Sequence, residues 1–554
     1  MRTILCALFH LTLISTFAQV NYTANDKVIP SEEAFGSGVN IGYYNGWTLL
    51  QLSDIAVGNP NFNQKGLGIN TTRQSLPEHF QEQWGYDFRL GAFKHFEQYG
   101  GQLQHTIFVG YPSEAHRDTE VYCNEQDRNF DEKKANNNRD YQQSILFKNM
   151  YEPIWDNGEN GTPYNDENYY AAYLYKTVTL YKSYVKYWEI LNEPDQTASR
   201  YSNYAAGRAG NWWENNPSPC ECAIKAPIFH YIRMLRISWE IIKTVDPTAY
   251  VAIGGIGYPS FLDAVLRNTD NPNDGSTSKD FPLKGGAYFD VLSYHSYPHL
   301  DSSLKKWNNS KKGFDYFRHT DAAVKGVFAL KDRFQTVLDK HGYDDKQFPE
   351  KEWIITECNV PKVTINGGFG SGEVQRNFIV KVMIEARKQG LRQFQVYNLG
   401  DKMTFQEATT PYAEFNLMGM FKNMYPEDFS KIYGDMPTNQ HNHRITELGT
   451  AYRTINNALK GFSLDEKATA ALANFAGIDG GVFKNGNGER LLVIWAKTSS
   501  DKSEKAQAEL DLATFFKGKK LEKYTWNYSQ TNKMTALKGT KVSLTGSPMF
   551  IKVK

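Results

Sequence analysis

The stretch YWEILNEPDQ, residues 187–196, decides how this chain folds. An apolar, aromatic-rich run ends at Asn192-Glu193-Pro194, and proline lacks the N–H group that would continue a sheet ladder. A second stretch, KEWIITECN at 351–359, repeats the arrangement, with a run typical of a buried strand ending in Glu357. Each stretch is therefore predicted to be a central strand that presents a carboxylate at its carboxyl end.

Short strand-like runs recur on either side of these two strands, between residues 36 and 400. Each is followed by a helical pattern, or by a loop and then a helix. Several are continuous β-branched or aromatic runs, as expected for strands buried on both faces. This alternation is typical of α/β proteins, and eight repeats predict a (β/α)8 TIM barrel. The predicted strands are Gly38 to Tyr43, Gly68 to Gln74, Gln104 to Gly110, Lys186 to Leu191, Tyr250 to Gly255, Phe289 to Ser293, Glu352 to Thr356 and Gln393 to Tyr397.

Two connections of the predicted barrel are much longer than the others. Residues 111–170 follow the third strand, and residues 195–228 follow the fourth. Loops at the carboxyl ends of barrel strands build the binding site, so these two are expected to wall a cleft. After residue 455 the pattern changes to short alternating runs separated by Gly, Asn, Lys and Ser, which predicts a C-terminal β-sandwich. The predicted units are a signal peptide at 1–18, a catalytic barrel at 19–455 and a sandwich at 456–554.

The N-terminus and the overall charge narrow the functional class. The first residues, MRTILCALFHLTLISTFAQ, place one arginine before an apolar run that is shorter than a membrane span and is followed by small residues. This pattern predicts export, so we expect a secreted or periplasmic protein without membrane insertion. The 62 basic and 61 acidic side chains leave a net charge of +1, which disfavours a nucleic-acid partner. No feature of the sequence indicates an oligomeric state.

Four cysteines remain once the predicted signal peptide is removed. A bridge from Cys123 to Cys220 or to Cys222 would tie the two long loops together, and the sequence leaves that choice open. Cys358 directly follows Glu357 in a predicted buried strand, so a free, packed thiol is expected there. The cysteine spacing lacks the paired arrangement of a zinc site, and no metal is expected.

Glu193 and Glu357 are the candidate catalytic residues. Two carboxyl groups on the ends of barrel strands can face each other across the mouth of the barrel. Hydrolysis of a glycosidic bond uses such a pair, one group to protonate the leaving oxygen and one to attack or stabilise the anomeric carbon. This chemistry needs no cofactor, and none is expected. Glu189 and Glu352 lie within or at the start of their strands, so we expect them to be structural ion-pair members away from the catalytic face.

The two acidic strand ends resemble the pattern of glycoside hydrolase clan A, whose members are retaining enzymes. The likeness covers roughly residues 36–455. The sixth strand, FDVLSYHSYP at 289–298, is most similar to family 39-like members of the clan. The resemblance implies that Glu193 is the acid/base, that Glu357 is the nucleophile and that Asn192 binds the sugar 2-hydroxyl.

Three further residues take roles from the same resemblance. Arg73, in the segment TTRQSLP, resembles the arginine that keeps the nucleophile ionised. His295 and Tyr297 match the sixth-strand positions, where a tyrosine hydroxyl commonly bonds the nucleophile. Clan members often place a tryptophan at the end of the eighth strand, whereas this chain reads FQVYNLGD, so Tyr397 or Asn398 is expected to supply that wall.

Loop residues suggest what the cleft binds. Trp212 and Trp213 are adjacent candidates for stacking on sugar rings, whose apolar faces match flat aromatic side chains. His116 and Arg117 are candidates for binding sulfate or carboxylate groups. These charges, with a loose resemblance to clan A agarases and porphyranases, favour an algal galactan, sulfated or not.

The sequence therefore predicts a secreted retaining glycoside hydrolase that cuts a β-linked polysaccharide internally. Its expected partner is a polysaccharide or oligosaccharide substrate. Two alternatives stay open. One is an exo-acting β-glycosidase of the β-xylosidase or β-galactosidase type, since long loops form either a groove or a pocket. The other is a non-catalytic carbohydrate-binding protein, although such relatives usually lose one carboxylate and both are present here.

Overall fold

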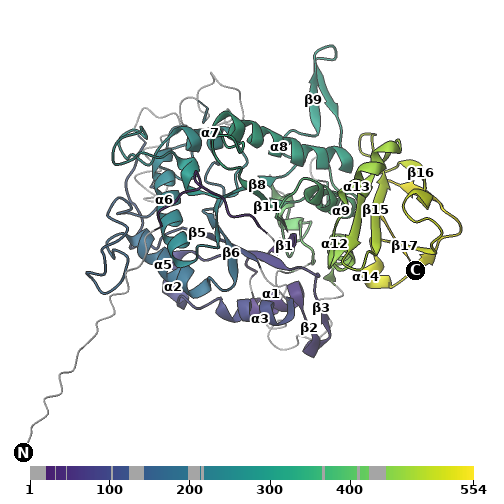
Figure 1. The fold of residues 1–554 in the computed structure, drawn as a ribbon, viewed down its shortest axis with the longest axis horizontal. Coiled ribbons are helices and arrows are strands. Elements are labelled where there is room, and N and C mark those ends of the chain that lie inside the picture. The colour runs from purple at the N-terminus through teal and green to yellow at the C-terminus, as the bar shows by residue number, and fades with distance from the viewer. Residues whose placement is uncertain are drawn as a thin grey trace, which may run out of the picture.

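The computed structural model describes residues 20–31, 33–44, 46–100, 104–123, 143–197, 212–213, 217–364, 368–408, 412–422, 424 and 444–553. The expected signal peptide at 1–18 lies outside these residues. Two units lie side by side, a large barrel unit and a smaller C-terminal unit drawn in light green and yellow (Figure 1).

Eight parallel strands close into a barrel, which confirms the predicted TIM barrel. The strands pair in the order β1-β12-β11-β8-β7-β6-β5-β4, and β4 returns to β1. All strand ends lie within three residues of the prediction, and β8 runs on to Ser296, which brings His295 into the strand. The strands are β1 (Gly36–Asn40), β4 (Thr71–Ser75), β5 (His105–Val109), β6 (Val185–Ile190), β7 (Tyr250–Ile253), β8 (Val291–Ser296), β11 (Glu352–Cys358) and β12 (Gln393–Val396).

Helices surround the barrel and cover its outer face (Figure 1). Their starts follow from capping residues: the Ser371 side chain accepts the N–H of Val374 at the start of α9, and Asn168 does the same for Ala171 at the start of α5. Their inner faces are apolar and pack against the strands. The helices are α1 (Leu49–Val57), α2 (Glu78–Trp84), α3 (Leu90–Gly100), α5 (Tyr169–Tyr181), α6 (Ile228–Val245), α7 (Pro259–Arg267), α8 (Thr320–Lys340), α9 (Gly372–Lys388) and α12 (Glu447–Leu459).

The C-terminal unit consists of antiparallel strands with an apolar core of their own. It packs on the barrel helices α8 and α9, where the Trp495 indole donates to Asp321 at 2.8 Å and Lys381 pairs with the same carboxylate at 2.7 Å. The paired strands are β13 (Phe462–Leu464), β14 (Ile478–Asn485), β15 (Arg490–Ala496), β20 (Met549–Val553), β17 (Leu521–Thr525) and β18 (Thr535–Ala536), with β16 (Gln507–Asp511) on β19 (Lys541–Thr545). Two short helices, α13 (Glu466–Ala470) and α14 (Tyr528–Thr531), complete the unit.

Two small hairpins extend from the barrel unit. One pairs β2 (Gly58–Asn59) with β3 (Gln64–Lys65), and the other pairs β9 (Lys305–Asn308) with β10 (Gly313–Tyr316). They lie at opposite edges of the view in Figure 1. Among the residues that the structure describes, no helix is both long and apolar enough to cross a membrane.

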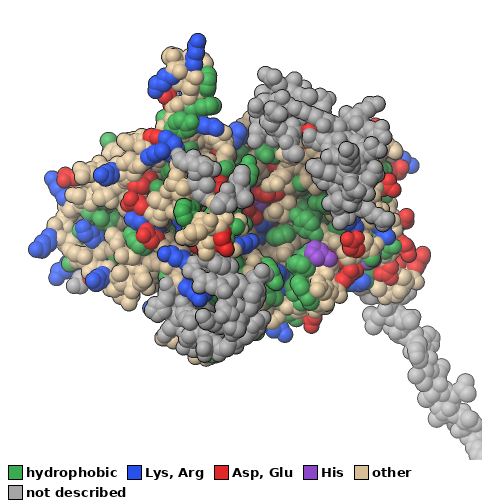
Figure 2. Space-filling view, turned by 180° about the vertical axis from the view of Figure 1, so that it is seen from behind, with side chains coloured by type: hydrophobic (Ala, Val, Ile, Leu, Met, Phe, Trp, Pro, Cys, Tyr) green, Lys and Arg blue, Asp and Glu red, His purple; other side chains and the backbone are tan. Residues whose placement is uncertain are grey.

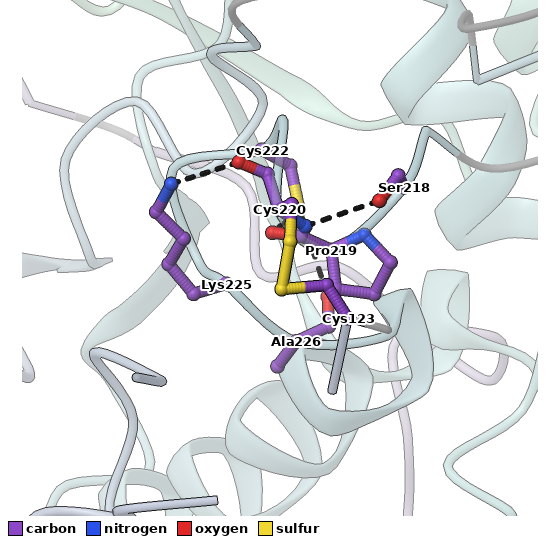
Figure 3. Close-up of a disulfide and its surroundings, with 7 residues drawn as sticks. All are labelled: Cys123, Ser218, Pro219, Cys220, Cys222, Lys225 and Ala226. Atoms are coloured by element: carbon purple, nitrogen blue, oxygen red, sulfur yellow. Dashed lines mark hydrogen bonds between the residues drawn. A yellow bond between two sulfur atoms is a disulfide. The ribbon is translucent and has the colours of Figure 1, made fainter. Parts of the chain in front are cut away.

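A disulfide joins the two long connections that follow β5 and β6. It links Cys123 to Cys220, which settles the choice that the sequence left open (Figure 3). Cys222 and Cys358 are buried free thiols, as expected for Cys358. The bridge holds together two segments that are 97 residues apart in the chain.

Candidate active site

The two candidate catalytic carboxylates meet at the carboxyl ends of the barrel strands. Glu193 lies just beyond β6, Glu357 lies near the end of β11, and an oxygen of one is within 4.8 Å of an oxygen of the other. Leu191 and Glu193 have left-handed backbone φ values of 64° and 50°, and the Glu193 N–H donates to the carbonyl of Gly254 at 2.9 Å. Left-handed non-glycine residues cost about 1–3 kcal/mol each and gather at functional sites. The chain thus turns sharply to aim Glu193 into the mouth of the barrel.

Glu357 accepts a strong hydrogen bond on each oxygen. Arg73, from β4, donates through Nη1 to Oε1 at 2.6 Å, and Tyr297, just after β8, donates its hydroxyl to Oε2 at 2.7 Å. Burial raises the pKa of Tyr297 well above its usual value, with a further contribution from Glu357, so the hydroxyl remains a donor. With one donor on each oxygen, the carboxylate is held in a fixed orientation, as a nucleophile requires.

Arg73 is the centre of a buried polar cluster under the site. Its guanidinium donates through Nε to Glu189 at 2.6 Å, through Nη2 to Asn192 at 2.7 Å and through Nη1 to Asn40 at 3.0 Å. Burial lowers the pKa of Arg73, but Glu189 and the other nearby carboxylates outweigh it and the net shift is upward. Arg73 therefore stays charged and fixes the position of Asn192, the expected partner of the sugar 2-hydroxyl.

Glu189 and Glu352 both form ion pairs, as predicted, but in different places. Glu352 pairs with Arg392 at 2.6 Å, at the start of its strand. Glu189 is fully buried inside the barrel and pairs with Arg73, which in turn contacts Glu357. The expectation that Glu189 lies away from the catalytic face was therefore wrong. Its Oε1 also accepts the hydroxyls of Ser293 and Thr356, both at 2.7 Å.

His295 connects the two candidate catalytic carboxylates. Its Nδ1 lies 2.7 Å from Glu193 and 3.7 Å from Glu357, and its Nε2 lies 2.9 Å from the Thr356 hydroxyl. Burial lowers the pKa of His295, but the charges of Glu357 and Glu193 outweigh this effect and raise it. A Cβ on Gly255, where φ is +51°, would lie 2.3 Å from Nε2, so only glycine fits there.

Glu193 also accepts a hydrogen bond from the side chain of Gln196, one turn further along the loop. Between them, Asp195 turns away from the site and accepts the N–H groups of Gly257 and Tyr258, both at 2.7 Å. Burial and the nearby charge of Glu193 raise the pKa of Asp195 to about 7, although the two N–H donors oppose the shift.

Tyr397 lies beside the nucleophile candidate at the end of β12. Its ring contacts Tyr297 and Phe415 edge-on, at centroid distances of 6.0 and 6.1 Å. Burial raises the pKa of Tyr397 to about 12, with the charge of Glu357 as the next cause. It therefore occupies the position where the sequence predicted a wall of the cleft.

The structure corrects the expectation for Trp212. Its side chain is only 1% exposed, packs edge-on against Phe261 at 5.0 Å and donates through Nε1 to the Asp195 carbonyl at 3.2 Å. A ring that is buried in the protein core cannot stack on a sugar, so Trp212 anchors the loop behind Glu193. Trp213 is partly exposed, so it stays a stacking candidate.

His116 and Arg117 are engaged with protein groups. His116 Nδ1 lies 2.9 Å from Glu78, and its ring stacks on Tyr169 with centroids 4.2 Å apart. Arg117 donates through Nε to the Ser144 carbonyl at 2.9 Å. These contacts hold the long loop after β5 against its neighbours, so we correct their expected role from sulfate binding to loop anchoring.

Two groups of side chains in the described part of the chain have donor atoms close enough to surround a cation. One is the candidate catalytic group, where Arg73 already occupies one side of the nucleophile, and the other lies beside the β5 loop. They are Glu193 with His295 and Glu357, and Glu78 with Glu82 and His116.

Several site residues were not foreseen. Asn40, at the end of β1, could have been suspected from its place at a strand end, as could the LNEPDQ segment that carries Asp195 and Gln196. By contrast, Lys402, directly after the FQVYNLGD segment, is a charged candidate that the sequence does offer; desolvation lowers its pKa and the charge of Glu357 opposes that shift. Only the three-dimensional packing shows which of their groups are shared with the catalytic pair.

Comparison with known proteins gives likenesses to solved structures. No family model and no curated protein match the chain. A family 30 subfamily 8 xylanase from Clostridium acetobutylicum matches with a TM-score of 0.47 and 9% identity over 94% of this chain and 96% of its own. A glucosidase from Croceicoccus marinus matches with a TM-score of 0.43 and 10% identity, over 95% of this chain and 99% of its own. A GH51 α-L-arabinofuranosidase from Thermotoga petrophila matches with a TM-score of 0.43 and 13% identity, over 96% of this chain and 98% of its own. Likeness at these values concerns the fold alone.

Proposed function

We propose that this protein is a retaining glycoside hydrolase with Glu193 as the acid/base and Glu357 as the nucleophile. The observation that carries the proposal is the approach of the two carboxylates to within 4.8 Å at the mouth of the barrel. Retaining enzymes hold their carboxyl groups about 5–5.5 Å apart, whereas inverting enzymes need about 6.5–9.5 Å to admit a water molecule. The short approach supports direct attack on the sugar.

In the first step, an oxygen of Glu357 attacks the anomeric carbon while Glu193 gives its proton to the departing glycosidic oxygen. A covalent glycosyl ester forms as the glycosidic bond breaks. Arg73 and Tyr297 hold the attacking carboxylate by one hydrogen bond on each oxygen, at 2.6 and 2.7 Å. This limits the rotation of the carboxylate and keeps the reacting atoms in line.

In the second step, the ionised Glu193 takes a proton from water as that water attacks the anomeric carbon. The ester bond breaks and Glu357 leaves as a carboxylate, so both residues return to their starting forms. His295 contacts both carboxylates, at 2.7 and 3.7 Å. Its Nδ1 faces both carboxylates, so it can hold Glu193 in position while the proton moves.

We further propose that the protein is exported and that its substrate is a β-linked polysaccharide of the galactan class, cut internally. Support for a negatively charged polymer comes from Lys402, whose ammonium group lies in electrostatic range of Glu357. Tyr397 and Trp213 supply aromatic surface for sugar rings. An exo-acting β-glycosidase would use the same catalytic pair, so product size separates the two modes.

The test is a panel of algal, plant and microbial polysaccharides incubated with wild type, Glu193→Gln and Glu357→Gln, with reducing ends and product sizes recorded. We expect wild type to release oligosaccharides of mixed length from one polymer, with rapid loss of viscosity, and both variants to lose turnover while still binding it. Steady release of one small sugar would establish exo-action. Equal activity of Glu357→Gln and wild type would refute the assignment.

A further inference from the structure

The hairpin formed by β9 and β10, residues 305–316, exposes an unusual amount of aromatic surface. Trp307, Phe314 and Tyr316 are 52%, 45% and 46% exposed. The hairpin projects from the body of the molecule, at the upper left of Figure 2, with hydrophobic and basic side chains along it. An isolated two-stranded hairpin gains little stability from its own packing. Aromatic rings on such an element mark an interaction surface.

These rings lie on one face of the hairpin. The register pairs Phe314 with Trp307 and Tyr316 with Lys305, and residues two apart on a strand point to the same side. Trp307 and Phe314 meet edge-on with centroids 5.1 Å apart, and the Lys305 ammonium lies 5.0 Å above the Phe314 ring. The result is a continuous strip of three rings bordered by a cation, which we call the aromatic strip.

The hairpin is positively charged as a whole. The segment KKWNNSKKGFDY at 305–316 contains four lysines and one acidic residue, Asp315, which pairs with Lys311 at 2.6 Å. Lys306 and Lys312 are exposed. An apolar protein partner could pack on the rings but would make no favourable contact with these lysines. A polysaccharide that carries sulfate or carboxylate groups matches both the rings and the positive charge.

The base of the hairpin is held firmly. Arg318, directly after it, pairs with Asp501 of the C-terminal unit at 2.6 Å and lies 4.4 Å from the Tyr316 ring. The Lys502 N–H donates to the Arg318 carbonyl at 2.8 Å. The aromatic strip is thus presented at a fixed position, which lowers the entropy cost of binding.

The hairpin is also close in the chain to the catalytic residues. Lys305 follows Tyr297, the hydrogen-bond donor to Glu357, by eight residues, which span at most about 28 Å when fully extended. The strip therefore begins within about 28 Å of Tyr297, close enough for one polymer chain to contact both.

We propose that the aromatic strip is a secondary binding site for an anionic polysaccharide, which it holds outside the catalytic cleft through ring stacking and contacts from lysine. This inference rests on the proposed function for the identity of the polymer as the substrate. The strip keeps a long polysaccharide attached to the protein between cuts. It therefore favours the binding of polymers and has no effect on short oligosaccharides.

The experiment is affinity electrophoresis in native gels that contain ι-carrageenan as the sulfated galactan or agarose as the neutral one. All proteins carry Glu357→Gln so that the polymer stays intact. The test variant adds Trp307→Ala with Phe314→Ala, and the conservative variant adds Trp307→Phe. The matched control adds Phe62→Ala, which removes a ring that is 51% exposed on the segment between β2 and β3, at the opposite edge of the molecule (Figure 1).

We expect ι-carrageenan to retard the parent protein. The double variant should bind with an apparent affinity about tenfold weaker, and the Trp307→Phe and Phe62→Ala forms should bind about as well as the parent. Lys305→Gln with Lys306→Gln should reduce the dependence of retardation on salt. Equal thermal midpoints for all forms show that the fold is intact.

Three results would overturn the inference. The first is equal retardation of the parent and the double variant, and the second is equal retardation by agarose and ι-carrageenan. The third is a dimer in sedimentation that is absent in the double variant, since the strip would then bind a second copy of the chain. The proposed function is judged separately. Retardation by ι-carrageenan, with no hydrolysis of any polymer of the panel by wild type, would refute the function and still support the strip as a binding site.

Discussion

Asp195 offers a sharp test of the electrostatics beside the acid/base. Its carboxyl is 1% exposed, and burial with the charge of Glu193 raises its pKa from 3.8 to about 7. The pKa of Asp195 is higher in the folded protein than in the unfolded chain. Its contribution to the free energy of unfolding is therefore fully present below about pH 4 and is lost as the pH rises through about 7. Ionising Asp195 in the folded protein costs about 4 kcal/mol more than in the unfolded chain.

The perturbation is Asp195→Asn, which keeps the shape and an oxygen that accepts the N–H groups of Gly257 and Tyr258 but does not titrate. Linkage over these two pKa values removes about 2.6 kcal/mol from wild type between pH 5 and pH 8. For a barrel of about 440 residues this corresponds to about 3 °C in the thermal midpoint. From pH 5 to pH 8, the thermal midpoint of wild type should therefore fall by about 3 °C more than that of Asp195→Asn.

The assay is differential scanning calorimetry of both proteins at half-unit steps from pH 5 to pH 8. Glu193→Gln is the matched control, because it removes the second cause of the shift and should reduce the pH-dependent loss without abolishing it. Parallel curves for wild type and Asp195→Asn would show that Asp195 is ionised throughout and would refute the reasoning.

Three further predictions concern stability and the cleft. Arg73→Met leaves two buried carboxylates without their cation, so we expect a loss of about 3–5 kcal/mol, read as a lower thermal midpoint than wild type; an unchanged midpoint would contradict the buried-pair account. Cys123→Ser opens the bridge to Cys220 and should cost up to about 4–5 kcal/mol and speed proteolysis of the loops, whereas unchanged cleavage by trypsin would show that the bridge constrains nothing. Trp212→Ala removes a buried ring that packs on Phe261 and should cost about 3–5 kcal/mol, and a loss of sugar binding with no loss of stability would restore the stacking role.

The sequence was sufficient for the barrel and for the position of the two candidate carboxylates because both depend on local patterns. Strands buried on both faces appear as continuous apolar runs, and an acidic residue at the carboxyl end of such a run lies at the barrel mouth wherever the strands close. Arg73, His295 and Tyr297, each at or near a strand end, came instead from the resemblance to clan A, which supplied their expected roles. Their contacts with Glu193 and Glu357 needed only the barrel geometry.

The loops could not be predicted in the same way. Trp212 looked like a stacking residue, but its exposure depends on how the loop after β6 folds back on α7, which no periodicity records. Glu189 lies within its strand, and only the register across the barrel shows that it supports Arg73 from below. The choice of Cys220 over Cys222 as the partner of Cys123 likewise depends on the loop path.

The measurement that tests the central claim most directly is the anomeric configuration of the first product, followed by proton NMR during hydrolysis of the β-linked polymer that the panel identifies. Double displacement through Glu357 and Glu193 predicts that the β-anomer of the new reducing end appears first and then mutarotates. Initial appearance of the α-anomer would mean single displacement by water, and it would contradict the assignment of Glu357 as nucleophile.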